Sequence, residues 1–317
     1  MTTGSTSTVP PSVGVAPRHL LEVDDLTPAE LARILDLSEL ADPPRVLAGS
    51  GAALLFEKPS ARTRTSMEMA VVQLGGHPVT LKAEEIGIDT RETAEDLARL
   101  LSGYTSVIGA RVFHHHKVER MAAAATVPVV NLLSDDAHPV QTLADLLTVR
   151  QELGSLAGRT VAYVGDANNV ARSLGIGCGL AGMGFRISSP PGYAFDEASL
   201  DRIRAAGADV EVREDPRDAV DGADAVYTDA WYSMGQEEER RTRQEAFARW
   251  RVDGALLDAA APGAVFLHCL PAHRGDEATD DVLDGPRSRI WRQAHNRMDT
   301  ARGLLLWLLG DDAAGTA

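Results

Sequence analysis

Short apolar runs alternate along the chain with segments in which apolar residues recur at helical spacing. The runs are predicted as buried strands and comprise residues 53–56, 78–81, 107–108, 127–131, 160–164, 185–188, 208–212, 225–228 and 264–268. Helices are predicted at 62–74, 93–103, 117–124, 142–153, 169–182, 197–206, 216–222 and 242–258, with one more near the end of the chain. Such alternation is typical of parallel sheets flanked by helices, so the pattern predicts an α/β fold.

The length of the chain, 317 residues, is enough for two domains with separate cores. The boundary is predicted in the stretch 154–159, directly after a helix. The first domain is then expected at 18–153 and the second at 154–295, while a terminal helix at 296–312 packs back onto the first domain. Residues 1–17 are rich in Ser, Thr, Pro and Gly, and we expect a disordered tail there.

Polar residues gather after the predicted strands of both domains. These clusters are 60–64, Arg111, 134–141, 166–169, 229–235 and 268–271. The carboxyl ends of parallel strands meet at one edge of a sheet, where ligands bind in this fold class. Clusters in equivalent places of two domains predict one active site in the cleft between them.

The most informative cluster opens the first long helix. Ser60 follows a proline and is predicted to cap this helix, with Arg62, Thr63 and Arg64 in its first turn. Arginines repel the positive end of the helix dipole unless an anion binds there. Free backbone N–H groups, hydroxyls and guanidinium groups would then converge on one phosphate. A solvated basic helix start is the alternative, at the expense of local repulsion.

Two further motifs belong to the first domain. Arg111 ends a predicted strand, where it can reach an oxygen atom in the cleft, although a lone Arg is usually a surface residue. His138 and Gln141 flank a proline that starts a helix. They are equally consistent with a capping loop and with a site in which His138 donates to a carbonyl and Gln141 binds an amide group.

The second domain offers groups for a polar, cationic substrate. Asn168 and Asn169 follow the clearest buried strand, and Asp229 opens a segment that ends in Gly235 and is predicted to be a mobile loop around an amino acid. Cys269 ends another strand. It is interpreted either as a buried thiol without a role or as a residue close to the reacting groups.

Three patterns are interpreted as structural. The glycines of 177–182 match a dinucleotide fingerprint by letter but lie inside a predicted helix, so NAD binding is rejected. The histidines at 114–116 point in different directions and are expected in a solvated loop, without a metal. The charged run 236–243 is expected to be a solvated loop or helix surface.

The net charge and the cysteine content limit which partners and which cellular compartment the sequence predicts. A formal net charge of −15 argues against nucleic acid or an anionic membrane as partner, and it makes a basic spot more informative. Two cysteines, Cys178 and Cys269, fit a reducing, cytoplasmic setting. The longest apolar run, 304–309, is too short to span a membrane.

Four motifs together resemble the aspartate/ornithine carbamoyltransferase family. Residues 60–64 (Ser-Ala-Arg-Thr-Arg) resemble its Ser-Thr-Arg-Thr-Arg phosphate loop. Residues 138–141 are similar to its His-Pro-x-Gln, and residues 268–271 to its His-Cys-Leu-Pro. Residues 229–235 resemble the Asp-x-x-x-Ser-Met-Gly loop of the ornithine branch, and the likeness runs in order from about residue 18 to about residue 310.

The resemblance implies transfer of a carbamoyl group from carbamoyl phosphate to ornithine, giving citrulline and phosphate in arginine biosynthesis or degradation. It implies a homotrimer with active sites near subunit borders and no metal or organic cofactor. Carbamoyl phosphate would be held by Ser60, Ala61, Arg62, Thr63, Arg111, His138, Gln141, Cys269, Leu270 and Arg297. Ornithine would be held by Asn169, Asp229, Ser233 and Met234, and the catalytic residues would be Cys269, Arg111 and His138.

Two departures from the family pattern leave alternatives open. Ala61 lacks the hydroxyl of the usual Thr. The loop that usually offers a Gln to the neighbouring subunit carries Lys82 and Glu85; the lysine could replace the Gln, whereas the glutamate would repel a phosphate. The alternatives are a relative that carbamoylates another amine (putrescine, lysine or an acylated ornithine) and a catalytically silent phosphate-binding subunit.

Overall fold

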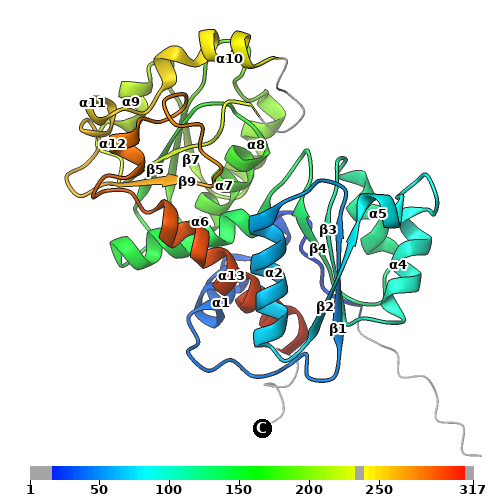
Figure 1. Cartoon of the computed structure of the whole chain (residues 1–317). Coiled ribbons are helices and arrows are strands. Elements are labelled where there is room, and N and C mark those ends of the chain that lie inside the picture. Colours follow the sequence, from blue (N-terminus) through cyan, green and yellow to red (C-terminus); the bar gives the residue numbers. More distant parts are fainter. Residues whose placement is uncertain (1–15, 233–238, 311–317) are drawn as a thin grey trace, which may run out of the picture.

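The computed structural model describes residues 16–232 and 239–310 of the chain. It contains two parallel sheets, each flanked by helices (Figure 1). The first has the strand order β2-β1-β3-β4, formed by β1 (Gly51–Phe56), β2 (His77–Lys82), β3 (Val107–Arg111) and β4 (Val129–Leu133). The second has the order β7-β6-β5-β8-β9, formed by β5 (Thr160–Val164), β6 (Gly184–Ser188), β7 (Asp209–Val212), β8 (Ala225–Thr228) and β9 (Val265–His268). The predicted α/β class is confirmed.

The helices belong to the two sheets and to the junction between them. The first group comprises α1 (Pro28–Ser38), α2 (Ala61–Gln73), α3 (Ala83–Ile86), α4 (Ala94–Ser102) and α5 (His116–Ala124), with the 3-10 turn η1 (Val23–Asp25). The second comprises α7 (Asn169–Leu180), α8 (Glu197–Ala205), α9 (Pro216–Val220), α10 (Arg240–Phe247), η3 (Ala248–Trp250), α11 (Gly254–Leu257) and α12 (Asp280–Leu283). Between the sheets lie α6 (Pro139–Leu153) and α13 (Ile290–Gly310) (Figure 1). No helix within the described ranges is long and apolar enough to cross a membrane.

Most strands read as continuous apolar runs because both of their faces are covered, whereas β2 and β7 at the sheet edges are partly exposed. In β1, Leu54 packs in the core shared with α1, α2 and α13, whereas Leu55 faces the core formed with α4 and α5. This alternation places the polar residues that follow each strand at the carboxyl edge of the sheet.

The prediction of one continuous helix at 242–258 is wrong. It is divided into α10, η3 and α11. The backbone at Arg251 is extended, and the amide of Val252 donates a hydrogen bond to the carbonyl of Glu277. A new helix then starts at Asp253, whose side chain caps the amide of Leu256. A cap inside a helical pattern ends one helix and begins another.

The ends of other elements also differ from prediction. The last helix begins at Ile290 rather than 296, and it packs against α1, α2 and α6. The helix expected at 142–153 begins at Pro139, so His138 is its N-cap. Helix α1 was not predicted, although Thr27 and Glu30 form a capping box at its start.

Candidate active site

The start of α2 is the place where the sequence predicts an anion site, and we call it the socket. Ser60 is its N-cap, and its side chain accepts a hydrogen bond from the amide of Thr63 (3.3 Å). Arg62 is half-buried and has no hydrogen-bond or ion-pair partner anywhere in the described residues. A helix N-terminus beside an unpaired guanidinium group is an environment that favours an anion.

Arg64 does not join this socket, which corrects the expectation that both arginines face one phosphate. Its Nε donates to Oε1 of Glu68 (2.8 Å), one turn along the same helix. That carboxylate also accepts from the hydroxyl of Thr80 (2.6 Å) on β2. The side chain of Arg64 is 47% exposed and lines a hollow beside the socket, with its Nε held by Glu68.

Two buried arginines complete the positive charge of the socket. Burial, and then the charges of Arg297 and Arg62, lower the pKa of Arg111 to about 10. The pKa of Arg297 is also lowered to about 10, chiefly by burial. The Nε atoms of Arg111 and Arg297 are buried without a hydrogen-bond partner. Buried cations that repel one another and keep a donor atom without a hydrogen-bond partner are typical of an anion site.

His138 lies among these arginines. It is 5% exposed, its Nδ1 has no hydrogen-bond partner within the described part of the chain, and its side chain does not cap α6. Burial, and then the three nearby arginine charges, lower the pKa of His138 well below its usual value. The imidazole is therefore neutral at pH 7, and a neutral ring can hydrogen-bond a carbonyl oxygen. Its backbone amide donates to Ser173 Oγ (3.0 Å) across the junction between the sheets.

Gln141 and Thr63 are tied to the last helix. Arg297 donates to Gln141 Oε1 (2.5 Å) and to Thr63 Oγ1 (3.2 Å). All three side chains are at most 5% exposed. Arg297 therefore joins the start of α2 to the start of α6.

A hollow of about 350 Å³ adjoins the outer side of the socket, and Ser60, Ala61 and Lys82 are among its lining residues. Glu85 does not face the phosphate loop, because its carboxylate accepts from the backbone amide of Lys82 (2.7 Å) and caps α3. Lys82 is exposed on the rim.

The second sheet contributes a carboxylate and a thiol. Asp229 follows β8, and its Oδ1 accepts from Cys269 Sγ (2.9 Å) while Oδ2 accepts from Asn168 Nδ2 (3.0 Å). Burial, and then Asp229, raise the pKa of Cys269 well above its usual value. Cys269 therefore stays a protonated thiol. It can hold or orient a proton but is a poor nucleophile.

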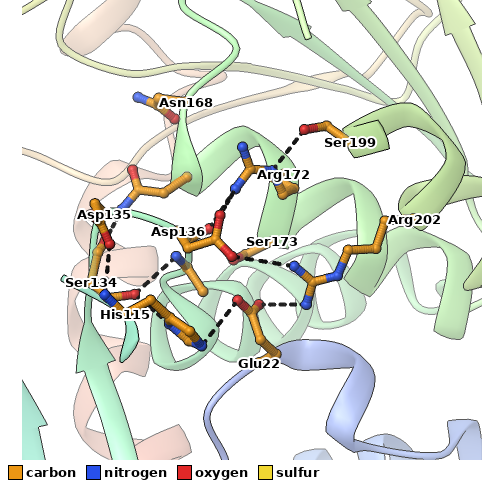
Figure 2. Close-up of polar contacts among 12 residues, drawn as sticks. Glu22, His115, Ser134, Asp135, Asp136, Asn168, Arg172, Ser173, Ser199 and Arg202 are labelled. Carbon is orange, nitrogen blue, oxygen red and sulfur yellow. Dashed lines mark hydrogen bonds and ion pairs between the residues drawn. The ribbon is translucent and has the colours of Figure 1, made fainter. Parts of the chain in front are cut away.

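Asn169 links the second domain to the first rather than lying free in a loop. Its Nδ2 donates to the carbonyl of Ser134 (2.7 Å), at the end of β4. Beside it, Arg172 pairs with Asp136, and Arg202 contacts Glu22 (3.3 Å), as Figure 2 shows. Arg202 also pairs with Asp24 (2.8 Å). These contacts hold the two halves of the site against each other.

Two predictions about exposed side chains need correction. His115 does not lie in a solvated loop: its side chain is 13% exposed, and Nδ1 bonds to Ser134 Oγ (2.8 Å), as Figure 2 shows. Arg243 does not lie on a solvated surface. It is 8% exposed and donates to Asp166 (2.8 Å) and to the carbonyl of Trp231 (2.9 Å).

One candidate site residue was missed. Lys58 is half-buried with Nζ 4.5 Å from the centre of the Phe113 ring. Burial, and then the charge of Arg111, lower its pKa. Its place two residues before Ser60 was the available signal. Ser233 and Met234, expected to hold ornithine, lie outside the described residues.

A metal ion does not fit the one cluster of potential ligands found within 16–232 and 239–310. The ligand atoms of Asp229, His268 and Cys269 lie within 4.8 Å of one another. However, His268 Nδ1 accepts from the amide of Leu270 (2.8 Å), and Nε2 bonds to Glu277 (3.1 Å). Both ring nitrogens are therefore engaged, and metal binding would break one of these bonds.

Family models match both halves of the chain. The model of the carbamoyl-P binding domain of aspartate/ornithine carbamoyltransferase covers residues 18–151, and that of the Asp/Orn binding domain covers residues 157–308. The chain belongs to the aspartate/ornithine carbamoyltransferase family.

Relatives within this carbamoyltransferase family are similar over nearly their whole length. The ornithine carbamoyltransferase of Acidothermus cellulolyticus is 50% identical over 307 residues, which are 94% of this chain and 98% of that protein. That of Thermus thermophilus is 49% identical over 297 residues, covering 92% and 97%. The solved structure of the Pyrococcus furiosus ornithine carbamoyltransferase superimposes with a TM-score of 0.89 at 42% identity, covering 94% of this chain and 99% of that one.

Proposed function

We propose that the chain transfers the carbamoyl group of carbamoyl phosphate to the side-chain amine of L-ornithine, giving L-citrulline and phosphate. The names of its relatives support this activity. The observation that carries the proposal is the socket at the start of α2. There Arg62, Arg111 and Arg297 gather with neutral His138, and no carboxylate within the described chain hydrogen-bonds to any of the three guanidinium groups.

The socket accounts for binding and activation of carbamoyl phosphate. The phosphoryl oxygens bind the free amides at the α2 start together with Ser60, Arg62 and Thr63. Arg111 and His138 donate to the carbonyl oxygen, whose negative charge grows as the carbon becomes tetrahedral. Gln141 binds the carbamoyl amide, and Arg297 holds Gln141 in place. These donors are already in place and need no rearrangement. They therefore stabilise the transition state more strongly than they stabilise the bound substrate.

The second sheet accounts for the acceptor. The carboxylate of Asp229 attracts the cationic end of ornithine, and Asn169 lies across the cleft from the socket. The amine attacks in its neutral form, the new C–N bond forms, and the C–O bond to phosphate breaks. The amine proton leaves with the phosphate, while the protonated thiol of Cys269 orients the attacking nitrogen. Holding both small reactants together supplies much of the rate.

Finer properties are part of the same proposal. We propose an enzyme of arginine biosynthesis or degradation, and a cytoplasmic location supported by two unpaired cysteines. We propose a homotrimer, supported by exposed apolar side chains on the first sheet and its helices, such as Val72, Val79 and Tyr104. Domains at 18–153 and 154–295 agree with the chain positions of the two sheets, and α13 packs against α1 and α2 of the first half.

A panel of amines tests the function directly. Citrulline-type product is measured with carbamoyl phosphate and ornithine, putrescine, lysine or N-acetylornithine at equal concentrations. We expect kcat/KM for ornithine to exceed the others by at least about a hundredfold. N-acetylornithine would leave the carboxylate of Asp229 unpaired, lysine is one methylene longer, and putrescine lacks the carboxylate of ornithine. A higher kcat/KM for another amine would show that this amine, and not ornithine, is the acceptor. Binding of carbamoyl phosphate without turnover of any amine would identify a silent subunit.

A further inference from the structure

A series of buried polar side chains joins the anion socket to the loop at 268–271. It starts at Arg297, which donates to Gln141 Oε1 (2.5 Å), and Gln141 Nε2 donates to Oδ1 of Asp145 (2.8 Å). The same oxygen accepts from Gln293 Nε2 (2.6 Å), and Gln293 Oε1 accepts from the backbone amide of His268 (2.9 Å). We call these five residues the polar relay.

The relay is shielded from water. Asp145 and Gln293 are 0% exposed, Gln141 is 2% exposed and His268 is 1% exposed. A broken bond in such a place has no water to replace it, so each member is strongly constrained by its partners.

Asp145 determines how both amide side chains are turned. Gln141 must present its oxygen to Arg297, and Gln293 must present its oxygen to the amide of His268. Both amide nitrogens then face Asp145, which is the acceptor they share. A flipped amide would leave a donor facing a donor on one side and an acceptor facing a carboxylate on the other.

The far end of the relay reaches residues at the reacting centre. The ring of His268 accepts the amide of Leu270 at Nδ1 (2.8 Å) and bonds to buried Glu277 through Nε2 (3.1 Å). Leu270 has a φ of 60°, in the left-handed region that non-glycine residues rarely adopt. Its backbone therefore depends on the contact with His268, and Cys269 lies between the two.

We propose that Asp145 and Gln293 are positioning residues that fix the orientation of Gln141 and the placement of Cys269 and Leu270 relative to the anion socket. This inference rests on the proposed carbamoyl transfer. Neither residue touches substrate. Asp145 lies on α6 and Gln293 on α13, the two helices between the sheets, so the relay connects both halves of the site through the junction (Figure 1).

The test uses three variants of the relay and two matched controls. Asp145→Leu and Gln293→Met remove hydrogen bonds with little change in volume, and Asp145→Asn keeps an acceptor oxygen. The controls are Thr148→Val and Asn296→Leu. Asn296 donates to Thr148 Oγ1 (2.8 Å) between the same two helices, and this buried bond belongs to neither end of the site.

We expect Asp145→Leu and Gln293→Met to lower kcat by about ten- to a hundredfold, as a small misplacement of reacting groups does. The dissociation constant for inorganic phosphate should change less than about threefold, because the α2 start and Arg62 hold the anion. Asp145→Asn should retain kcat within about fivefold, because it keeps an acceptor oxygen. Both controls should keep the kcat of the wild type even where their melting temperature falls as much as that of the relay variants. Unchanged kcat in folded relay variants, or an equal loss in the controls, would overturn the proposal.

A second readout does not depend on turnover. Hydrogen exchange of the peptide that contains the His268 amide is compared between wild type, Gln293→Met and Asn296→Leu. We expect faster exchange in Gln293→Met alone, because only this variant removes the acceptor of that amide. Equal exchange in all three proteins would refute the relay even if the enzyme is active. An inactive wild type with the expected exchange pattern would refute only the proposed function.

Discussion

Ala61 is the first residue of α2, where a backbone amide has no partner within the helix. It is exposed and lines the hollow of about 350 Å³ beside the socket. The family loop has a threonine at this place, and Ala61 offers no hydroxyl to an anion. The socket therefore relies on its neighbours Ser60, Arg62 and Thr63.

Restoring the hydroxyl should strengthen anion binding. We predict that Ala61→Thr lowers the dissociation constant for carbamoyl phosphate by about fivefold, equivalent to about 1 kcal/mol for one added hydrogen bond. Ala61→Val is the matched control, since it has the same shape without the hydroxyl. Titration calorimetry measures both, and equal affinities of the two variants would show that position 61 does not contact the ligand.

Single residues also show how far sequence reasoning reached at the site. The cap at Ser60 was predictable because capping rules act locally. Arg64 was assigned wrongly because Glu68, at the i+4 position, binds it instead. That spacing is visible in the sequence. The buried pair Arg243–Asp166 was not visible, because its members lie far apart in the chain and meet only in the fold.

At the scale of elements, most strands were predicted well because both of their faces are buried, as in β1, β3, β5 and β8. Helix α13 was predicted six residues short of its start at Ile290. Its first turns carry Gln293, Asn296 and Arg297, which are polar but buried. Periodicity detects apolar faces, so a helix that buries hydrogen-bonded polar groups escapes it. The same property makes Gln293 and Arg297 suited to a role at the site.

At the scale of the whole molecule, the two sheets are joined by charged contacts beside Asn169 (Figure 2). Glu22 lies there with His115 at 3.8 Å and Arg202 at 3.3 Å, and Arg202 also contacts Asp24 and Asp136. Burial is the largest cause that raises the pKa of Glu22 to about 8, while Arg202 opposes the rise. Several carboxylates compete for one guanidinium group, and the most buried of them holds a proton.

This junction should make stability fall with rising pH. The pKa of Glu22 is about 8 in the folded protein against an ordinary value of 4.5, so only the folded state binds this proton between those values. Its contribution is complete below about pH 4.5 and is lost as pH rises towards 8. We predict that Glu22→Gln flattens the pH dependence of the urea midpoint between pH 5.5 and pH 8.5. If the urea midpoint of the wild type and of Glu22→Gln changed with pH at the same slope, the pH dependence would come from other groups.

The central claim is that the start of α2 binds the phosphoryl group of carbamoyl phosphate. Titration calorimetry of wild type, Arg62→Ala and Arg64→Ala tests it most directly, since the two arginines share one helix turn but only Arg62 lacks a carboxylate partner. We predict a loss of at least about a hundredfold in affinity for Arg62→Ala, from its charge-assisted hydrogen bonds, and less than about threefold for Arg64→Ala. Near-normal binding by Arg62→Ala, or an equal loss in both variants, would contradict the account.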